Sequence, residues 1–172
     1  GLAAQIALGL LQHLPDQALD SVAEVHQQIE VMKIATATAA KRFADPAAMT
    51  VSVEALLDEA SLRRAAAAVT ERAMTLPPAV LPVGHDTVYL ATADASGMMV
   101  SFIQSNFRAF GSGIVIPGTG IAMQNRGSGF VLDADHVNSV GPKKRPFHTI
   151  IPGFVTAQGL PEMAFGVMGG HM

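Results

Sequence analysis

The sequence has no cysteine, no tryptophan and only one tyrosine, and just 15% of its residues are charged. Without cysteine, disulfide bonds, thiolate metal sites and cysteine nucleophiles are excluded from this chain. The formal net charge of -3 gives no electrostatic reason to expect nucleic acid or an anionic membrane as a partner. There is no run of about 18 apolar residues, so the sequence predicts no membrane span in this segment.

The sequence contains enough apolar residues to form a hydrophobic core. Hydrophobic residues make up 49% of the 172 residues, which predicts a globular chain of about one domain in size. The six histidines are scattered, and none forms the i, i+4 pair of a helical zinc site. The glycine runs lack the lysine and the strand-loop-helix context of a phosphate-binding loop. We therefore expect neither a metal nor another cofactor.

The first half of the chain has helical periodicity. Apolar residues recur every four positions from Leu2 to Leu14, and the pair Ser21 and Glu24 has the spacing of a capping box at the start of a long helix. Ser61 is expected to cap a later helix. The predicted helices cover residues 2–14, 21–43, 51–57 and 61–69.

The second half follows a proline-rich stretch at 75–84 and reads as short strands separated by glycine. Proline lacks an amide donor, so the stretch is predicted to be irregular and exposed, as a processing site should be. Thr87 is expected to open the first strand. The predicted strands cover residues 89–93, 99–104, 114–116, 121–123, 150–157 and 162–168. Helices first and strands second predict an α+β fold.

Three glycine-containing motifs follow Thr87. They are Phe110-Gly111-Ser112-Gly113-Ile114-Val115, Gly141-Pro142-Lys143-Lys144-Arg145-Pro146, and Gly169-Gly170. In this order and spacing they resemble the γ-glutamyltranspeptidase family of N-terminal-nucleophile hydrolases. The resemblance implies the αββα sandwich of that superfamily, here partial, and a precursor that is cut between Asp86 and Thr87. A mid-chain threonine taken alone is more often a plain strand residue.

The resemblance also implies a division of the chain. Residues 1–76 would be the helical end of a large subunit, 77–86 the processing linker, and 87–172 the beginning of a small subunit. Family members are much longer, so we expect an internal segment of a larger enzyme. Its partners would then be the rest of the large and small subunits and a small-molecule substrate.

The implied catalytic residues are Thr87, Gly169 and Gly170. A threonine hydroxyl is a weak nucleophile until a base takes its proton, and the free α-amine of an N-terminal threonine can do so. The reference pKa of such an amine is about 8, so part of it is neutral at neutral pH. Two successive glycines leave backbone amides unshielded, as an oxyanion hole requires. A glycine pair can equally be an ordinary turn.

Candidate substrate-binding residues lie near the end of the second predicted strand. A hairpin brings its first and last residues side by side, so Gln104 and Asn106 are expected near the Thr87 hydroxyl. The family uses a threonine and an asparagine two residues apart here. Asn106 matches the asparagine, whereas Gln104 replaces the threonine. The other interpretation is two polar residues at a strand end.

Three more candidates are Arg126, His148 and Thr149. In the family two serines at the position of His148 and Thr149 hold the substrate carboxylate, and both residues here can donate hydrogen bonds. The family also carries an acidic pair that binds the substrate ammonium, where this sequence has Ser128 and Gly129. Arg126 is positive instead, which suits an acyl group with a carboxylate and no amine, such as glutaryl.

The sequence therefore leaves three functions open. The first is a γ-glutamyltransferase or glutathione hydrolase-like enzyme that cleaves γ-glutamyl amides through an acyl-enzyme. The second is a glutaryl or cephalosporin-type acylase of the same superfamily. The third is a non-catalytic segment that is never cut.

Overall fold

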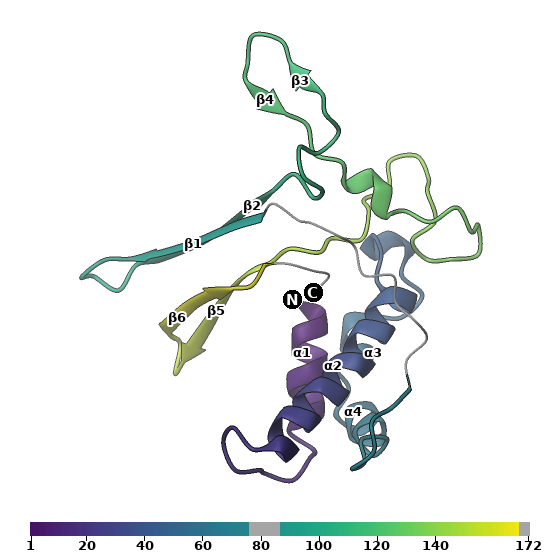
Figure 1. Ribbon diagram of the computed structural model, residues 1–172, viewed down its shortest axis with the longest axis vertical. Helices are drawn as coiled ribbons and strands as arrows, with labels where there is room; N and C mark the ends of the chain where they lie inside the picture. Colours follow the sequence, from purple (N-terminus) through teal and green to yellow (C-terminus); the bar gives the residue numbers. More distant parts are fainter. Residues whose placement is uncertain (76–86, 169–172) are drawn as a thin grey trace. The chain divides into compact units, whose positions relative to one another are not determined.

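The structure is a computed structural model that describes residues 1–75 and 87–168, and it divides into two compact units (Figure 1). Within the described residues, the first unit comprises 1–75 and Val131–Arg145, and the second comprises 87–130 and 146–168. The first unit is mainly helical and the second is built from strands, which confirms the α+β class.

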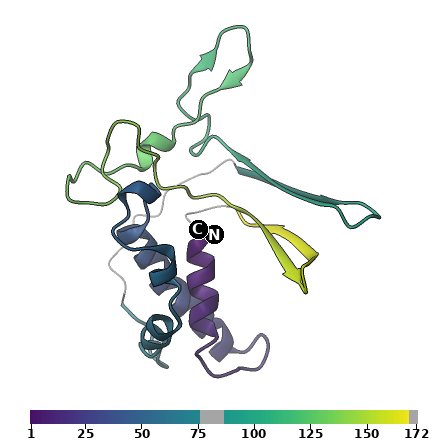
Figure 2. The same cartoon turned by 180° about the vertical axis from the view of Figure 1, so that it is seen from behind.

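The helical unit is organised around its first two helices. Helix α1 packs against α2 and α4, and α1 and α2 lie side by side in opposite views (Figures 1 and 2). The helices are α1 (Leu2–Leu11), α2 (Val22–Arg42), the 3₁₀ helix η1 (Pro46–Ala48), α3 (Val53–Leu56) and α4 (Glu59–Ala66). The buried apolar residues of this unit are Ala3, Ile6, Ala7, Leu10, Val31, Ala35, Ala39, Phe43, Leu62 and Ala66. Half of them are alanines, which lets the helices approach closely.

The ends of the helices confirm one predicted N-cap residue and correct another. The Ser21 hydroxyl accepts a hydrogen bond from the Glu24 amide at 3.1 Å, which confirms the predicted cap of α2. Ser61 as the cap of α4 was wrong: the Asp58 carboxylate caps that helix by accepting from the Ser61 amide at 2.9 Å. Helix α1 is shorter than predicted, because Pro15 disfavours helix before it. The intervening residues form tighter turns, with amide-to-carbonyl bonds from residue 13 to 10 and from 14 to 11.

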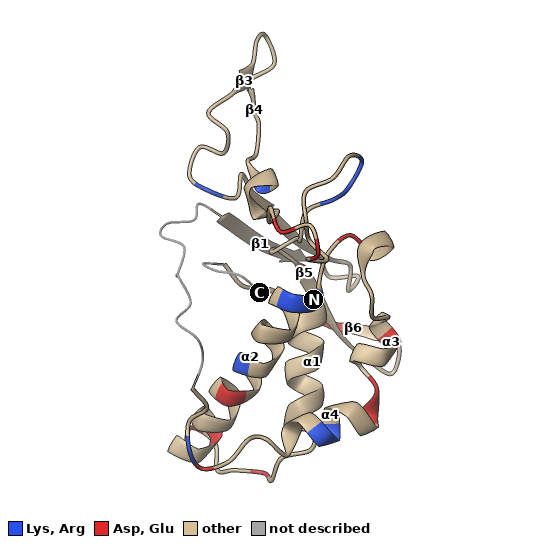
Figure 3. Cartoon of the chain, turned by 90° about the vertical axis from the view of Figure 1, so that its right-hand side faces the viewer, with Lys and Arg blue, Asp and Glu red and all other residues tan. Residues whose placement is uncertain are grey.

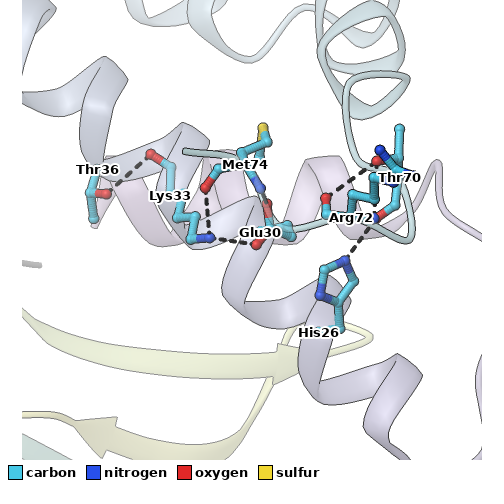
Figure 4. A network of polar contacts seen from close by, with 7 residues as sticks. All are labelled: His26, Glu30, Lys33, Thr36, Thr70, Arg72 and Met74. Carbon is cyan, nitrogen blue, oxygen red and sulfur yellow. Dashed lines mark hydrogen bonds and ion pairs between the residues drawn. The ribbon is translucent and has the colours of Figure 1, made fainter. Parts of the chain in front are cut away.

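A buried carboxylate fastens the segment after α4 to helix α2 (Figure 4). Glu30 is 1% exposed, and its oxygens accept from Lys33 Nζ at 2.6 Å and from the Met74 amide at 2.8 Å. Lys33 Nζ also donates to the Met74 carbonyl at 3.1 Å. His26 donates from Nε2 to the Thr70 carbonyl at 2.7 Å. These bonds hold residues 70–74 along α2.

We expect Glu30→Gln to lower the thermal unfolding midpoint of the complete protein by several degrees at pH 7. The bonds from Lys33 and then Met74 lower the Glu30 pKa, so its stabilising contribution exists above its ordinary pKa of 4.5. That contribution is lost as the pH falls through the lowered pKa, so the difference between variant and wild type should shrink in acid. Thermal scans at pH 7 and in acid measure this.

The matched control for that prediction is Glu59→Gln. Glu59 also accepts from a cation at 2.6 Å, from Arg63 one turn away, but its side chain is 74% exposed. Exposed helix pairs contribute little to stability, so this variant should melt close to the wild type at both pH values. Equal melting of the two variants would mean that burial of the Glu30 network has no stabilising role.

The second unit consists of three antiparallel two-stranded sheets within the described residues. The pairs are β1 (Thr87–Ala93) with β2 (Met99–Ser105), β3 (Val115–Ile116) with β4 (Ile121–Ala122), and β5 (Pro152–Ala157) with β6 (Leu160–Gly166). Each of these three pairs overlaps two neighbouring strands that the sequence predicts. The last turn is tighter than expected: only Gln158 and Gly159 connect β5 to β6, both with positive φ, at 53° and 81°. Such two-residue turns match the twist of a hairpin.

The first and last hairpins contact each other through β2 and β6. A Cβ on Gly166 would lie 2.4 Å from the Tyr89 ring, so glycine is what allows that ring to cross β6. The Tyr89 and Ser101 hydroxyls are 2.9 Å apart, and Ser101 donates to the Phe165 carbonyl at 3.2 Å. Strands β1 and β2 contain no charged residue (Figure 3), yet much of their apolar surface is exposed.

The segment Val131–Arg145 belongs to the helical unit although it is flanked on both sides by the strand unit. His136 donates from Nε2 to the Ala40 carbonyl at 3.1 Å. Asp45 Oδ2 accepts from the Arg145 amide at 2.9 Å and pairs with Arg145 Nε at 3.5 Å. The basic turn at 141–146 is thus fastened to Asp45, which neutralises one of its three charges. Among the described residues, no helix is both long enough and apolar enough to cross a membrane.

Candidate functional site

Thr87 is the first residue of strand β1, and the hairpin register places it directly opposite Ser105 at the end of β2. Residues directly opposite in an antiparallel pair present their side chains on the same face. The Thr87 hydroxyl donates to Ser105 Oγ at 3.0 Å. The hydroxyl of the predicted nucleophile is therefore oriented by a second hydroxyl on the neighbouring strand.

Ser105 also links Thr87 to the turn that follows β2. Its Oγ accepts from the Phe107 amide at 2.9 Å. Phe107 is 5% exposed and has a φ of 79°, a backbone conformation that non-glycine residues rarely adopt. The bond from Ser105 supports this sharp change of direction after β2, which buries the Phe107 side chain.

Arg126 lies at the start of the 3₁₀ helix η2 (Arg126–Gly129) and is 7% exposed. The centre of its guanidinium is 5.3 Å from the centre of the Phe107 ring, within cation–π range. Nη1 donates to Thr149 Oγ1 at 3.0 Å. Nη2 is buried and has no hydrogen-bond partner among the residues that the structure describes. Burial lowers the pKa of Arg126, but a guanidinium stays charged at neutral pH.

His148 precedes Thr149 and feels the same charge. Its Nδ1 is 3.0 Å from the Ile150 carbonyl and donates to it, which orients the ring. Burial and then the charge of Arg126 lower the His148 pKa, so the imidazole is neutral at pH 7. The cluster of Arg126, His148 and Thr149 therefore carries a single positive charge.

The structure brings Arg126 into contact with Thr149 and close to His148, three residues that sequence reasoning put forward as substrate-binding. Gln104 lies opposite Val88, and alternation along the strand puts its side chain on the face away from Thr87. Asn106 follows β2, and its carbonyl accepts from the Asn125 amide at 3.1 Å. The contact of Asn106 with substrate stays a prediction. The catalytic glycines 169 and 170, and the expected cut after Asp86, lie outside the described residues.

Sequence reasoning missed Ser105 and Phe107, although a signal for Ser105 was present. The hairpin turn is closed by Asp94, whose carboxylate accepts from the amides of Ser96 at 2.8 Å and Met98 at 3.1 Å. This turn pairs residue 93 with 99, and counting back along both strands pairs 87 with 105. In this register Ser105, and not Gln104, shares the face of Thr87, and a contact of Gln104 with substrate stays a prediction.

Within residues 1–75 and 87–168, no group of three or more histidine, aspartate or glutamate side chains is placed to hold a metal ion. What the described site can offer is a hydroxyl nucleophile, hydrogen-bond donors and one buried cation. Such groups serve acyl transfer through a covalent intermediate.

The fold and the site define an α+β protein whose strand unit has a threonine at the head of a hairpin and, in the same unit, a buried cation. A model of the family described as Gamma-glutamyltranspeptidase matches residues 1–172. The chain belongs to this family, within the N-terminal-nucleophile hydrolase superfamily.

Three proteins with different names are similar to this chain. The Glutathione hydrolase-like YwrD proenzyme of Bacillus subtilis (strain 168) is 40% identical over 146 residues, covering 85% of this chain and 27% of that protein. The Oxamate amidohydrolase proenzyme of Klebsiella pneumoniae is 37% identical over 170 residues, covering 99% and 32%. The crystal structure of cephalosporin acylase from Bacillus halodurans superposes with a TM-score of 0.88 at 48% identity, covering 98% and 31%. The chain thus spans about a third or less of the length of these relatives.

Proposed function

We propose that the protein containing this chain is an amide-cleaving enzyme whose nucleophile is Thr87, freed as an N-terminus by cleavage of a precursor. The observation that carries the proposal is the position of Thr87 at the first residue of β1, with its hydroxyl held 3.0 Å from Ser105 Oγ. The family membership supports it, and both curated relatives described above are named proenzymes.

The proposed reaction proceeds through an ester on Thr87. The free α-amine of Thr87 takes the hydroxyl proton, and Oγ1 attacks the carbonyl carbon of the substrate amide. The amides of Gly169 and Gly170 would stabilise the oxyanion, a role that belongs to the proposal because both residues lie outside the described part. The leaving amine departs with the proton. Water, or an acceptor amine, then releases the acyl group and regenerates the hydroxyl.

The domain division belongs to the same proposal. Residues 1–76 would end the large subunit, 77–86 would form the linker, and 87–172 would begin the small subunit. The bonds of Glu30 and Lys33 to Met74 would keep the end of the large subunit attached to α2 after the cut. An isolated two-stranded ribbon is marginally stable. The exposed apolar faces of β1 and β2 therefore support an αββα sandwich that the rest of the protein completes.

Two acyl donors fit the proposal. γ-Glutamyl amides are the substrates that the family membership favours, as in a γ-glutamyltransferase or glutathione hydrolase. Des-amino acyl amides such as glutaryl compounds are the second candidate. The residues Ser128 and Gly129 favour this second candidate, because neither supplies a carboxylate for a substrate ammonium. The similarity to a cephalosporin acylase supports it as well.

The test combines processing with a pair of substrates. Mass spectrometry and N-terminal sequencing of the complete expressed protein should show two chains, the second beginning at Thr87. γ-Glutamyl-p-nitroanilide and glutaryl-p-nitroanilide, assayed side by side, then report which donor is used. A single uncut chain without activity would support the non-catalytic alternative. A correctly cut protein that turns over neither compound would refute both donors.

A further inference from the structure

The segment Val131–Arg145 belongs to the helical unit together with residues 1–75, although it lies on the other side of the proposed cut. We call it the connecting segment. Cleavage before Thr87 would leave residues 1–75 in the first chain and the connecting segment in the second. Such a cut removes the covalent link that keeps two binding partners at a high effective concentration. Contacts between these two parts therefore become contacts between chains.

His136 attaches the connecting segment to the C-terminal end of helix α2. Ala40 is one of the last four residues of α2, whose carbonyls have no partner within the helix. His136 Nε2 donates to the Ala40 carbonyl at 3.1 Å. Its other ring nitrogen, Nδ1, accepts from the Asn138 amide at 3.0 Å, which places the proton of the neutral ring on Nε2. A bond within the segment thus orients the ring toward the helix end.

The loop that carries His136 is held in shape by its own backbone. The Val131 amide donates to the Asn138 carbonyl at 3.1 Å, and the Val140 amide donates to the Val131 carbonyl at 3.0 Å. Asn138 is 4% exposed. Because the loop is ordered by bonds within itself, binding to α2 costs less conformational entropy than the binding of an unstructured chain.

Asp45 makes the second attachment, and it is 9% exposed. Its Oδ1 accepts from the Ala47 amide at 3.2 Å, and its Oδ2 accepts from the Arg145 amide at 2.9 Å. The Arg145 side chain is 76% exposed and its Nε lies 3.5 Å from Oδ2, so this ion pair contributes little. A hydrogen bond to a carboxylate is stronger than one between neutral groups. The backbone amide of Arg145 is therefore the main contact with Asp45.

We infer that the connecting segment keeps the two chains of the processed enzyme associated by binding the end of α2 and the carboxylate of Asp45. The inference rests on the proposed function, because only a cut protein has two chains to associate. The contacts are already formed while residues 1–172 are one chain. The two chains therefore never have to find each other in solution.

The experiment uses the complete, processed protein and measures how fast its two chains exchange between molecules. Isotope-labelled and unlabelled protein are mixed in moderate urea, and native mass spectrometry follows the appearance of mixed pairs. Asp45→Ala should raise the exchange rate roughly 10- to 150-fold, the range for loss of a hydrogen bond to a charged group. His136→Ala removes a neutral bond and should raise it roughly 2- to 10-fold. Arg145→Ala keeps the amide and should exchange close to the wild-type rate.

Two control variants lose the same kinds of bond within the first chain. Asp58 caps α4 by accepting from the Ser61 amide at 2.9 Å, and His26 donates to the Thr70 carbonyl at 2.7 Å. Asp58→Ala and His26→Ala should leave the exchange rate unchanged, because both bonds lie within residues 1–75. Dissociation depends on protein concentration, whereas local unfolding does not. Dilution should therefore increase the fraction of separated chains in Asp45→Ala and not in Asp58→Ala.

Exchange at the wild-type rate in both Asp45→Ala and His136→Ala would overturn the inference. Equal acceleration by the two control variants would do the same. If Asp45→Ala does not fold, His136→Ala tests the connecting segment at its other attachment. A complete protein that is never cut would refute the proposed function, and the segment is then tested with two coexpressed chains that meet between Asp86 and Thr87. Faster exchange of Asp45→Ala in that pair would leave the inference standing.

Discussion

Thr87→Ala is expected to leave the complete protein as one uncut chain and to abolish amide cleavage. The hydroxyl that would attack the preceding peptide bond is the same hydroxyl that would attack substrate, so one substitution removes both reactions. Loss of a covalent nucleophile costs on the order of 10⁴-fold or more in kcat. Intact-mass measurement and a p-nitroanilide assay of the same preparation check both effects.

Processing and catalysis can be separated by coexpressing the two proposed subunits as separate chains. Thr87→Ala at the start of the second chain should still be inactive, although no cut is needed. Thr87→Ser keeps a hydroxyl and should retain cutting and part of the activity. Ser105→Ala removes the acceptor of the Thr87 hydroxyl and should cost roughly tenfold. Full activity of the coexpressed Thr87→Ala protein would show that another group carries the reaction.

Local signals were sufficient for most of the fold. The Ser21 cap, the helical period of α2 and the glycine turns all act within a few residues, and each appears where it was predicted. The cap of α4 was misassigned because Asp58 and Ser61 are both good N-cap residues, and only the position of the first helical turn decides between them.

The sequence was sufficient to name several residues of the candidate site, but not their burial or their contacts with one another. Arg126, His148 and Thr149 stood out as departures from a family pattern. The burial of Arg126 and its contact with Phe107 depend on tertiary packing, which no local pattern encodes. The same holds for residues 131–145, whose attachment to the helical unit depends on Asp45, about 100 positions earlier in the chain. Ser105 is the exception, since the length of a five-residue turn already fixes its partner.

Gly111→Ala is expected to destabilise the protein strongly and to reduce its activity. Gly111 has a φ of +66°, and a Cβ there would lie 2.3 Å from the Met123 carbonyl oxygen. That oxygen cannot move freely, because it accepts from the amide and the hydroxyl of Ser112 at 2.9 and 3.0 Å. Left-handed strain of about 1–2 kcal/mol and overpacking of about 1–3 kcal/mol give roughly 2–5 kcal/mol. Urea unfolding measures the loss.

Gly113→Ala provides the matched comparison for this prediction. Gly113 has a similar φ of +74°, but no atom lies within 4 Å of its Cβ position, so only the left-handed strain of about 1–2 kcal/mol applies. The difference between the two variants isolates the clash with Met123, which lies three residues before Arg126. If that clash displaces the segment leading to Arg126, Gly111→Ala should also lower amide cleavage more than Gly113→Ala does. Equal destabilisation by both would mean that the chain around Met123 adapts without cost, and the tight approach at Gly111 would then have no role in positioning Arg126.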